Sequence, residues 1–403
     1  MKSLLNWDPK ARMRVISLSI VLCVSGCSSI APNYPTFSSR DLQRFATKTD
    51  LWLIQAQLEN GVFPYAYDPS TDQHDAKVIK RHQLIISRRL FDLALIRTRF
   101  QNIAETHVRA IDESLSKDDS PWNSGELVPP QSSPSPDVET KNEQTLGDQA
   151  FWLRTLIQLD AGQRSNRTQA VANQLLARWD TESGFPEIIH SRETTSTFIQ
   201  HYYSGQAALA MMEFHARASS NIAFKTGEDM LDWLELKRPA ANHDTFHPTL
   251  APWRAFAIAR HYEQARSPKY LPQLFALSDQ LLSLQTDKDF PGRFWSERTA
   301  KYGRPNATRD ALSTLTLIKS LEIAHAIGDT PRVKRYRRGI WLALDNLRSL
   351  QYDYGIVSAF PNPQAAVGAI RFRHNDAMIR SDAVVFSAEA FERSAKLVND
   401  GLL

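Results

Sequence analysis

Cysteine is nearly absent from this chain of 403 residues, because Cys23 and Cys27 are the only two and both lie near the start. If a leader is removed before Cys27, no disulfide can form and a large hydrophobic core must hold the fold. Long apolar runs are also lacking. The most apolar segment, Val15–Val24, spans about ten residues and is too short to cross a bilayer.

Runs of basic residues are missing as well. Removing residues 1–26 leaves 44 basic and 43 acidic residues, a net charge of +1. Electrostatics therefore give no support for nucleic-acid binding, and we expect no nucleic-acid partner.

Several motifs that mark common enzyme classes are absent. The chain has no Gly-x-Ser-x-Gly elbow, no phosphate-binding glycine loop and no dinucleotide fingerprint. His243 and His247 are four residues apart, but Pro248 indicates a loop and no third ligand is evident. We therefore expect neither a metal site nor a cofactor.

The start of the chain carries its clearest signal. Basic residues (Lys2, Lys10, Arg12 and Arg14) precede the apolar segment Val15–Val24, which leads into Val24-Ser25-Gly26-Cys27. This layout is typical of a secretory signal peptide over residues 1–26, and its last four residues resemble the lipobox of bacterial lipoproteins. The resemblance implies that Cys27 is lipidated. An ordinary signal peptide and an uncleaved membrane anchor are the alternatives.

Lipidation of Cys27 would make the bacterial membrane a partner, because several acyl chains together give stable anchoring. Ser28 follows the cysteine, where an aspartate would resemble the inner-membrane retention signal. The resemblance therefore favours the outer membrane, with the protein facing the periplasm. Other envelope proteins are candidate partners.

Composition divides the rest of the chain. Residues 27–47 are expected to form a tether, since Ser28–Ser39 is rich in serine and proline. A low-complexity segment at about 118–143 fits either an interdomain linker or an insertion. Similar helical patterns on both sides favour an insertion within one domain that spans residues 48–403.

Helical periodicity dominates this domain. Gly147–Leu159 places apolar residues on one face, and Leu312, Leu315, Ile318 and Leu321 recur every three residues. Ser204–Phe214 is apolar almost all round and is expected to pack on all sides. No alternating pattern is long enough for a substantial sheet, so the chain is predicted to be all-α.

A repeat emerges where these helices end. Glycine-containing loops follow apolar helix ends at residues 61, 184, 292 and 355, and weaker equivalents lie at 122 and about 240. The six loops are roughly 50 to 65 residues apart. That spacing fits one antiparallel helix pair per repeat, and a pair must stack on neighbours to bury its apolar face. The first and last units are both strongly apolar, which favours a closed (α/α)6 toroid over an open solenoid.

The loops at one mouth of such a ring would carry aromatic and polar residues around a shared cavity. Aromatic rings stack on sugars, while arginine, aspartate and glutamine bind hydroxyl or carboxylate groups. Sealing of the inner wall by the tyrosines is the alternative. The candidate substrate-binding residues are Tyr65, Tyr67, Arg81, His82, His201, Gln206, Trp295, Arg309 and Arg380.

The order of these motifs resembles bacterial six-hairpin-glycosidase-like proteins over nearly the whole mature chain. The motifs that carry the resemblance are Gly61–Pro69, Arg81-His82, Tyr202–Gln206, Ala307–Asp310 and Arg380–Asp382. The resemblance implies carbohydrate chemistry, by hydrolysis, elimination or uronyl epimerisation.

The candidate catalytic residues are Asp310, Asp382 and Tyr202. Glycoside hydrolysis usually needs two carboxyl groups that flank the bond, and Asp310 with Asp382 is the best available pair. Asp310 at a helix start is alternatively a dipole partner. For a lyase or epimerase, Tyr202, Tyr65, His82 or His201 would remove the proton beside a uronate carboxylate.

Two departures from the family pattern bear on activity. Gln206 stands where the pattern has glutamate, and a histidine expected shortly after Asp382 is missing. Arg309 and Arg380 either bind a uronate carboxylate or pair with the neighbouring aspartates. The sequence therefore predicts an enzyme acting on envelope or exported polysaccharide. The alternatives are a non-catalytic lipoprotein that binds glycan or supports envelope assembly, and a scaffold for protein partners.

Overall fold

The computed structural model describes residues 34–75, 78–117, 146–159, 166–185 and 196–403. Cys27, the predicted leader and the predicted insertion at about 118–143 lie outside the described residues. The compact unit Phe37–Leu403 carries the elements discussed below. Among the described helices, none combines the length and the hydrophobicity needed to cross a membrane.

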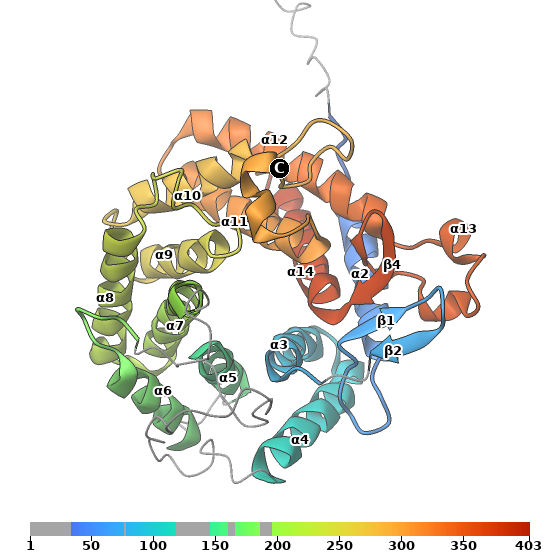
Figure 1. Ribbon diagram of the computed structural model, residues 1–403, viewed down its shortest axis with the longest axis horizontal. Helices are drawn as coiled ribbons and strands as arrows, with labels where there is room; N and C mark the ends of the chain where they lie inside the picture. The colour runs from blue at the N-terminus through green and yellow to red at the C-terminus, as the bar shows by residue number, and fades with distance from the viewer. Residues whose placement is uncertain (1–33, 76–77, 118–145, 160–165, 186–195) are drawn as a thin grey trace, which may run out of the picture. The chain divides into compact units, whose positions relative to one another are not determined.

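Two concentric rings of helices make up this unit (Figure 1). The inner helices are α3 (Lys80–Ile96), α5 (Leu146–Leu159), α7 (Ser196–Ala218), α9 (Ala251–Ala265), α11 (Ala307–Ala326) and α14 (Ser381–Asn399). The outer helices are α2 (Ser39–Gln55), α4 (Gln101–Lys117), α6 (Asn166–Arg178), α8 (Asn221–Lys237), α10 (Leu271–Ser283) and α12 (Thr330–Leu350). Inner and outer helices alternate along the chain.

The ring closes where the first described helix packs on the last. Phe45 of α2 lies against Phe391 of α14 with ring centroids 5.6 Å apart. Arg89 of α3 forms a buried ion pair with Asp50 of α2 at 2.7 Å and also contacts Glu392 of α14. These contacts connect the two ends of the domain, so the predicted (α/α)6 toroid is confirmed and the open solenoid is not.

Burial explains which helices lie inside. The segment Ala207–Met212 of α7 is completely or almost completely buried, as its all-round apolar pattern predicts. The outer helix α12 instead has one apolar stripe and an exposed face of basic residues. Each fully buried large apolar side chain contributes about 1.5–3 kcal/mol, and the inner wall supplies many of them.

The connections differ between the two ends of the ring. At the N-terminal ends of the inner helices they are long, comprising residues 56–79, 118–145, 179–195, 238–250, 284–306 and 351–380. At the other end they span only residues 97–100, 160–165, 219–220, 266–270 and 327–329. We call the end with the long connections the loop mouth and the other end the short-turn mouth. Five of the six predicted loop positions fall within the described loop-mouth connections, and the position at residue 122 lies outside the described residues.

Glycine is required where one of these loops meets the outer ring. Gly292 has φ +91°, and a Cβ atom there would lie 1.9 Å from the carbonyl oxygen of Leu342 in α12. Only glycine allows this approach, because it lacks the side chain that would collide with the backbone. The predicted loop at residue 292 is thus fixed against α12.

A small sheet lies at the loop mouth, which the sequence did not predict. It is antiparallel with the order β2-β1-β4-β3, formed by β2 (Gln73–Asp75), β1 (Ala66–Asp68), β4 (Asp376–Arg380) and β3 (Arg371–Arg373). Strands of three to five residues are too short to show an alternating pattern. Figure 1 shows this sheet beside α2 and the start of α14.

The first helix begins earlier than the expected tether allows. Residues 27–47 were expected to be a tether, whereas α2 starts at Ser39. Ser38 caps the helix by accepting a hydrogen bond from the backbone N–H of Asp41 at 3.1 Å, and Leu42 and Phe45 enter the core. The serines that indicated a tether therefore include a helix cap.

Candidate functional site

A cavity of about 310 Å³ opens where five inner helices begin, at the loop mouth. Its polar lining consists of Arg81, His82, Thr249, Asn306, Thr308, Arg309, Arg380 and Asp382. Its aromatic lining consists of Phe151, Trp253, Phe372 and Phe386. Helix N-termini carry partial positive charge, so their convergence favours anionic groups in this cavity.

Asp382 is the carboxylate in this lining, and three groups hold it. Arg380 donates from Nε to Oδ1 at 3.0 Å and from Nη2 to Oδ2 at 2.9 Å. Thr308 donates from Oγ1 to Oδ2 at 3.0 Å. Burial raises the pKa of Asp382, but the facing His82, Arg380 and Thr308 outweigh it and hold the pKa below its ordinary value. Asp382 is therefore ionised at neutral pH.

His82 faces this carboxylate. Its Nδ1 lies 3.9 Å from Oδ1 of Asp382 and has no hydrogen-bond partner among the described residues. Burial lowers the pKa of His82, with Arg380 and Arg81 adding to the effect and Asp382 opposing it. The imidazole is consequently neutral at pH 7, which leaves a ring nitrogen available to accept a proton.

Tyr65 covers the same pair from the loop that contains Gly61. Its ring centroid lies 4.9 Å from that of His82, and the Arg380 guanidinium carbon lies 4.8 Å from the Tyr65 ring. Burial raises the pKa of the Tyr65 hydroxyl, so this group is protonated at neutral pH. It can therefore donate a proton but does not act as a phenolate.

The small sheet brings these residues together. Ala66 of β1 pairs with Arg380 of β4, and the N–H of Ser381 donates to the carbonyl oxygen of Tyr65 at 3.3 Å. The loop near the start of the chain is therefore fastened to the first turn of α14 near its end. Tyr65, His82, Arg380 and Asp382 were all predicted site residues, and the structure places them in contact.

Arg309 lies on another wall of the cavity, in the first turn of α11. Its Nη2 donates to the carbonyl oxygen of Tyr302 at 2.6 Å, while Nε and Nη1 have no acceptor among the described residues. Burial lowers the pKa of Arg309, although Asp310 opposes this. The guanidinium is nonetheless charged at any physiological pH.

Of two further predicted substrate-binding residues, Arg81 lines the cavity and Gln206 does not. The Arg81 guanidinium lies over the ring of Tyr203 at 5.2 Å and its Nε is 3.6 Å from Asp148. Gln206 is fully buried and is not part of the cavity lining. A Cβ atom on Gly147 would lie 2.8 Å from its Oε1, so Gln206 packs against the start of α5.

Asp310 does not line the cavity. Its carboxylate is 1% exposed and accepts hydrogen bonds from the N–H of Phe294 and from Nδ2 of Asn346, both at 2.9 Å. Burial raises the pKa of Asp310 to about 6. This carboxylate ties a loop to an outer helix, and the structure does not bring it into the cavity with Asp382.

Two predicted aromatic residues also lie away from the cavity. Tyr67 is 1% exposed, and its hydroxyl donates to Asp72 at 2.7 Å within the sheet region. Trp295 contacts Arg293, whose guanidinium carbon is 5.6 Å from the Trp295 ring, and is not part of the lining. The side chains of His201 and Tyr202 lie outside the described residues, so their predicted roles stay predictions.

Three residues of the site escaped the sequence analysis. The sequence places Thr308 in the motif Ala307–Asp310 but does not predict its hydrogen bond to Asp382. Thr308 lies two residues after the helix cap Asn306, and from there its hydroxyl reaches this carboxylate. Phe372 covers Arg380 with the guanidinium carbon 4.3 Å from its ring. Trp253 lies in an apolar helix, where spacing alone predicts a core residue. A β-hairpin predicted around residue 374 would have been the sequence signal that Phe372 belongs to the site.

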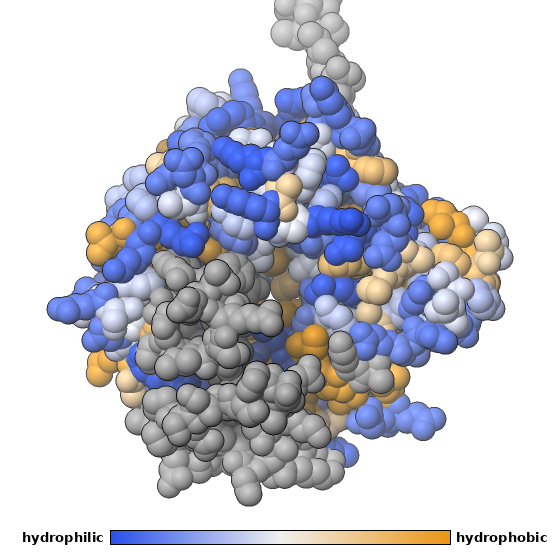
Figure 2. Space-filling model, viewed as in Figure 1, coloured by the Kyte–Doolittle hydropathy of each residue, from blue (hydrophilic) through white to orange (hydrophobic). Residues whose placement is uncertain are grey.

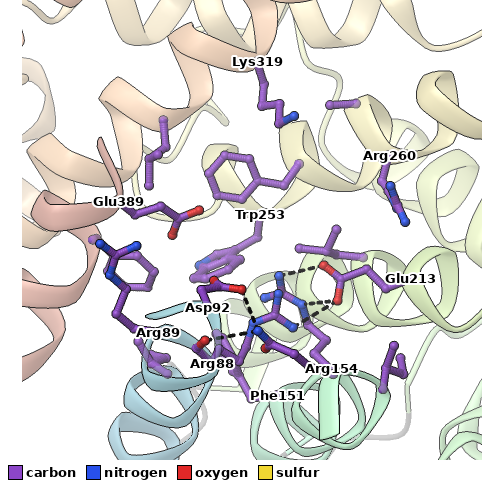
Figure 3. A pocket seen from close by; sticks show the side chains of 18 of the residues that line it. Arg88, Arg89, Asp92, Phe151, Arg154, Glu213, Trp253, Arg260, Lys319 and Glu389 are labelled. Carbon is purple, nitrogen blue, oxygen red and sulfur yellow. Dashed lines mark hydrogen bonds and ion pairs between the residues drawn. The ribbon is translucent and has the colours of Figure 1, made fainter. Parts of the chain in front are cut away.

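A second cavity of about 560 Å³ opens toward the short-turn mouth. Ile85, Phe151, Trp253 and Phe386 line both cavities and form the layer between them. The rings of Phe151 and Trp253 meet edge to face with centroids 5.2 Å apart. The second cavity differs in character, because charged residues from all six inner helices line it (Figure 3).

Several of these charges form ion pairs, although basic residues outnumber acidic ones in the lining. Glu213 accepts two hydrogen bonds from Arg154, at 2.8 and 2.9 Å, and one from Arg88 at 3.2 Å (Figure 3). Lys319 and Arg260 both contact Glu263 at 2.9 Å. The walls of the second cavity therefore form an ion-pair network that links neighbouring inner helices.

Metal ligands do not converge in the described part of the chain, where no three His, Cys, Asp or Glu residues form a cluster suited to an ion. Hydrophilic residues predominate on the described surface drawn in Figure 2, with apolar residues in separate small patches.

No protein-family model matches the chain, and no curated protein matches it in sequence. Solved structures do match. The GH76A alpha-1,6-mannanase from Salegentibacter sp. is 10% identical with a TM-score of 0.60, over 89% of this chain and 100% of that chain. A D-mannose isomerase is 11% identical with a TM-score of 0.61, over 90% and 99% of the two chains. An unsaturated glucuronyl hydrolase specific for heparin is 11% identical with a TM-score of 0.59, over 89% and 98%.

These similarities show the fold. The unit Phe37–Leu403 is an (α/α)6 toroid, and its structural neighbours are six-hairpin glycosidase-like toroids that act on carbohydrates. At these levels of identity the similarity does not carry a substrate or a reaction from one chain to another.

Proposed function

We propose that this protein is a carbohydrate-active enzyme that processes a polysaccharide at the loop mouth. The observation that carries the proposal is the placement of His82 and Asp382 together on one cavity, with the Tyr65 ring packed against His82. A neutral imidazole 3.9 Å from an ionised carboxylate can accept a proton, because the negative charge stabilises the protonated ring. The aromatic lining provides surfaces on which sugar rings stack.

Each residue has a distinct role in this proposal. His82 accepts a proton from the bound sugar or from a water molecule, and Asp382 stabilises the imidazolium that results. The Tyr65 hydroxyl, which stays protonated, donates to the oxygen on which negative charge develops. Arg380 keeps Asp382 in place, since its two hydrogen bonds fix the orientation of the carboxylate.

The structural neighbours support the substrate class. Among them are proteins named as a mannanase and as a glucuronyl hydrolase, both of which act on glycosidic bonds. The same (α/α)6 ring in this chain offers a cavity at the ends of the inner helices where the long loops gather. Loops on a rigid scaffold are the usual location of catalytic groups.

Activity is tested on a panel of bacterial polysaccharides with the full chain purified in detergent. New reducing ends report hydrolysis, unsaturated uronates report elimination, and uptake of deuterium from solvent reports epimerisation. His82→Asn and Asp382→Asn should each lower the turnover rate by about 100-fold or more, the usual contribution of an acid–base group. His325→Asn is the matched control, because His325 is exposed at the end of α11.

Thermal unfolding shows whether the variants are folded. Binding without turnover, unchanged in both site variants, would overturn the enzymatic proposal in favour of a non-catalytic glycan-binding lipoprotein. If both variants keep the wild-type turnover rate, residues other than His82 and Asp382 carry out the reaction. Loss of activity in His325→Asn as well would assign the effect to stability.

We further propose that the protein is anchored through Cys27 in the outer membrane and faces the periplasm. The basic, apolar and small-residue order of residues 2–27 supports this proposal. Growth with a radiolabelled fatty acid should label the wild-type chain and not the Cys27→Ala variant. Fractionation should then recover the labelled chain with outer-membrane markers, and recovery with inner-membrane or soluble markers would contradict the proposal.

A further inference from the structure

Four arginine side chains are almost completely buried in the described part of the chain. They are Arg89, Arg154, Arg254 and Arg309, each exposed by 4–9%. The first three contact a carboxylate, which is Asp50 for Arg89, Glu213 for Arg154 and Glu235 for Arg254. Arg309 makes no ion pair with any described carboxylate, so it differs from the other three.

The hydrogen-bonding capacity of Arg309 is also largely unused. Of its three nitrogens, Nη2 donates to the carbonyl oxygen of Tyr302, and Nε and Nη1 lack acceptors among the described residues. A buried charge without a counter-charge is costly, because desolvation is not offset by an ion pair. Such a group needs an anionic acceptor from outside the described chain to become satisfied.

Asp310, the neighbouring acid in sequence, does not fill this need. Its two oxygens accept hydrogen bonds from Phe294 and Asn346, so its carboxylate is committed elsewhere. The carboxylate that lines the cavity, Asp382, accepts two hydrogen bonds from Arg380. No described acid on the cavity is therefore available to Arg309.

The surroundings of Arg309 are positively charged. The pKa of His247 is lowered to about 3, first by burial and then by the charges of Arg238, Arg309 and Lys301. The first turn of α11 adds the partial positive charge of a helix N-terminus to the same wall. An anionic group beside Arg309 gains from the guanidinium charge and from the helix N-terminus.

We propose that Arg309 binds the carboxylate of the substrate, and that the glycan is therefore a polymer containing uronic acid. This inference rests on the proposed function and names its substrate class. A substrate carboxylate can accept a hydrogen bond from an unsatisfied nitrogen of Arg309, and it supplies the counter-charge that the buried guanidinium lacks. A neutral hexose, with a hydroxymethyl group in the same position, supplies no such charge.

The test compares two sets of ligands that differ only at this group. One set contains oligosaccharides of glucuronate, galacturonate and mannuronate, and the other contains their carboxyl-reduced counterparts. Calorimetry with the full chain measures both sets against the wild type and three variants: Arg309→Gln, Arg309→Lys and Arg304→Gln. Arg304 is exposed in the loop before α11 and serves as the control for general electrostatics.

The wild type should bind at least one uronate set more tightly than its reduced counterpart. Arg309→Gln should weaken uronate binding by about 30-fold or more, since the loss of one partner of a buried charge pair is costly, and should leave the reduced sugars within about threefold. Arg309→Lys should give an intermediate affinity because it keeps the charge. Arg304→Gln should bind like the wild type.

Two results would overturn the inference. The first is equal affinity of the wild type for uronates and reduced sugars, and the second is unchanged uronate binding in folded Arg309→Gln. If the chain turns over a neutral glycan through His82, the inference fails while the proposed function stands. If uronate binding depends on Arg309 and no turnover is found on any glycan, the inference stands and the enzymatic proposal fails.

Discussion

Asn346 and Asp310 are joined by a buried hydrogen bond of 2.9 Å, donated by Nδ2 of Asn346 to Oδ2 of Asp310. Because the Asn346 amide group donates here, its Oδ1 accepts from Nε2 of His374 at 2.8 Å. The ring of Phe290 stacks on His374 with centroids 3.7 Å apart. One chain of contacts therefore connects α11, α12, the β3–β4 turn and the loop at residue 292.

This network makes a prediction about pH and stability. Burial raises the pKa of Asp310 to about 6 from an ordinary value of 3.8. Between these two values the folded chain holds a proton that the unfolded chain has released, so Asp310 makes the free energy of unfolding fall as pH rises. The contribution is fully present below pH 3.8 and is lost through pH 6.

Asp310→Asn removes this titration. The difference in unfolding free energy between wild type and variant, measured in urea, should be larger at pH 5.0 than at pH 7.5. At pH 7.5 the variant should lose about 1 kcal/mol, because its amide group faces the Asn346 donor and one hydrogen bond is lost. An equal difference at both pH values would show that Asp310 does not titrate in this range.

A second prediction concerns the pH dependence of turnover. If His82 is the base, kcat/KM should rise with pH through the pKa of His82, which burial places below its ordinary value of 6.5. Arg380 lowers this pKa and Asp382 raises it. Arg380→Gln should therefore move the rising limb to higher pH, and the residual activity of Asp382→Asn should show the limb at lower pH.

These opposite shifts distinguish a titrating His82 from a structural one. Initial rates measured between pH 4 and 8, at saturating and at limiting polysaccharide, give the pH profiles of kcat and of kcat/KM. Shifts in the same direction in both variants, or no shift in either, would mean that another group provides the limb. His325→Asn should keep the wild-type profile.

The helical ring was predictable because its signals are local and repeated. Leu312, Leu315, Ile318 and Leu321 all lie on the buried side of α11, as their spacing predicts. Gly61, Gly184 and Gly292 each adopt positive φ in a loop-mouth connection. Apolar period and glycine position are properties of short segments, so a single sequence reveals them.

The cavity was only partly predictable because it depends on where first-turn side chains point. Arg309 and Asp310 are adjacent in one motif, yet Arg309 lines the cavity while Asp310 faces α12. The pairing of Ala66 with Arg380 joins segments more than 300 residues apart and has no local signal. The order of the motifs predicts which residues lie at the loop mouth but not the direction in which their side chains point.

Two glycines test how the loop at residue 292 is held. Gly292→Ala combines a positive φ with a clash against the Leu342 carbonyl, and Gly328→Ala has a similar φ of +77° but nothing within 4 Å of the new Cβ. Gly328→Ala should cost about 1–2 kcal/mol, the strain of a left-handed residue. Gly292→Ala should cost clearly more, as measured by urea unfolding, because backbone atoms must move. If both variants lose the same free energy of unfolding, the loop at residue 292 moves away from α12 at no further cost.

The last prediction concerns the second cavity and its ion pairs. Burial opposes ionisation of Glu213, but Arg154 and Arg88 outweigh it and lower the pKa to about 2. A carboxyl group with a lowered folded pKa stabilises the fold above its ordinary pKa of 4.5, and this stability is lost as pH falls toward 2. Glu213→Gln should therefore destabilise the protein at pH 7 and clearly less at pH 2.5.

The expected loss at pH 7 is about 3 kcal/mol, because the variant leaves the buried Arg154 guanidinium without its counter-charge. Glu322→Gln is the matched control, since Glu322 pairs with Lys319 on a partly exposed face. That change should cost less than about 1 kcal/mol, the usual value for such a pair. Chemical unfolding at both pH values gives the comparison. If Glu213→Gln does not change the free energy of unfolding at pH 7, solvent in the second cavity must stabilise the two arginines. The walls of that cavity would then be hydrated.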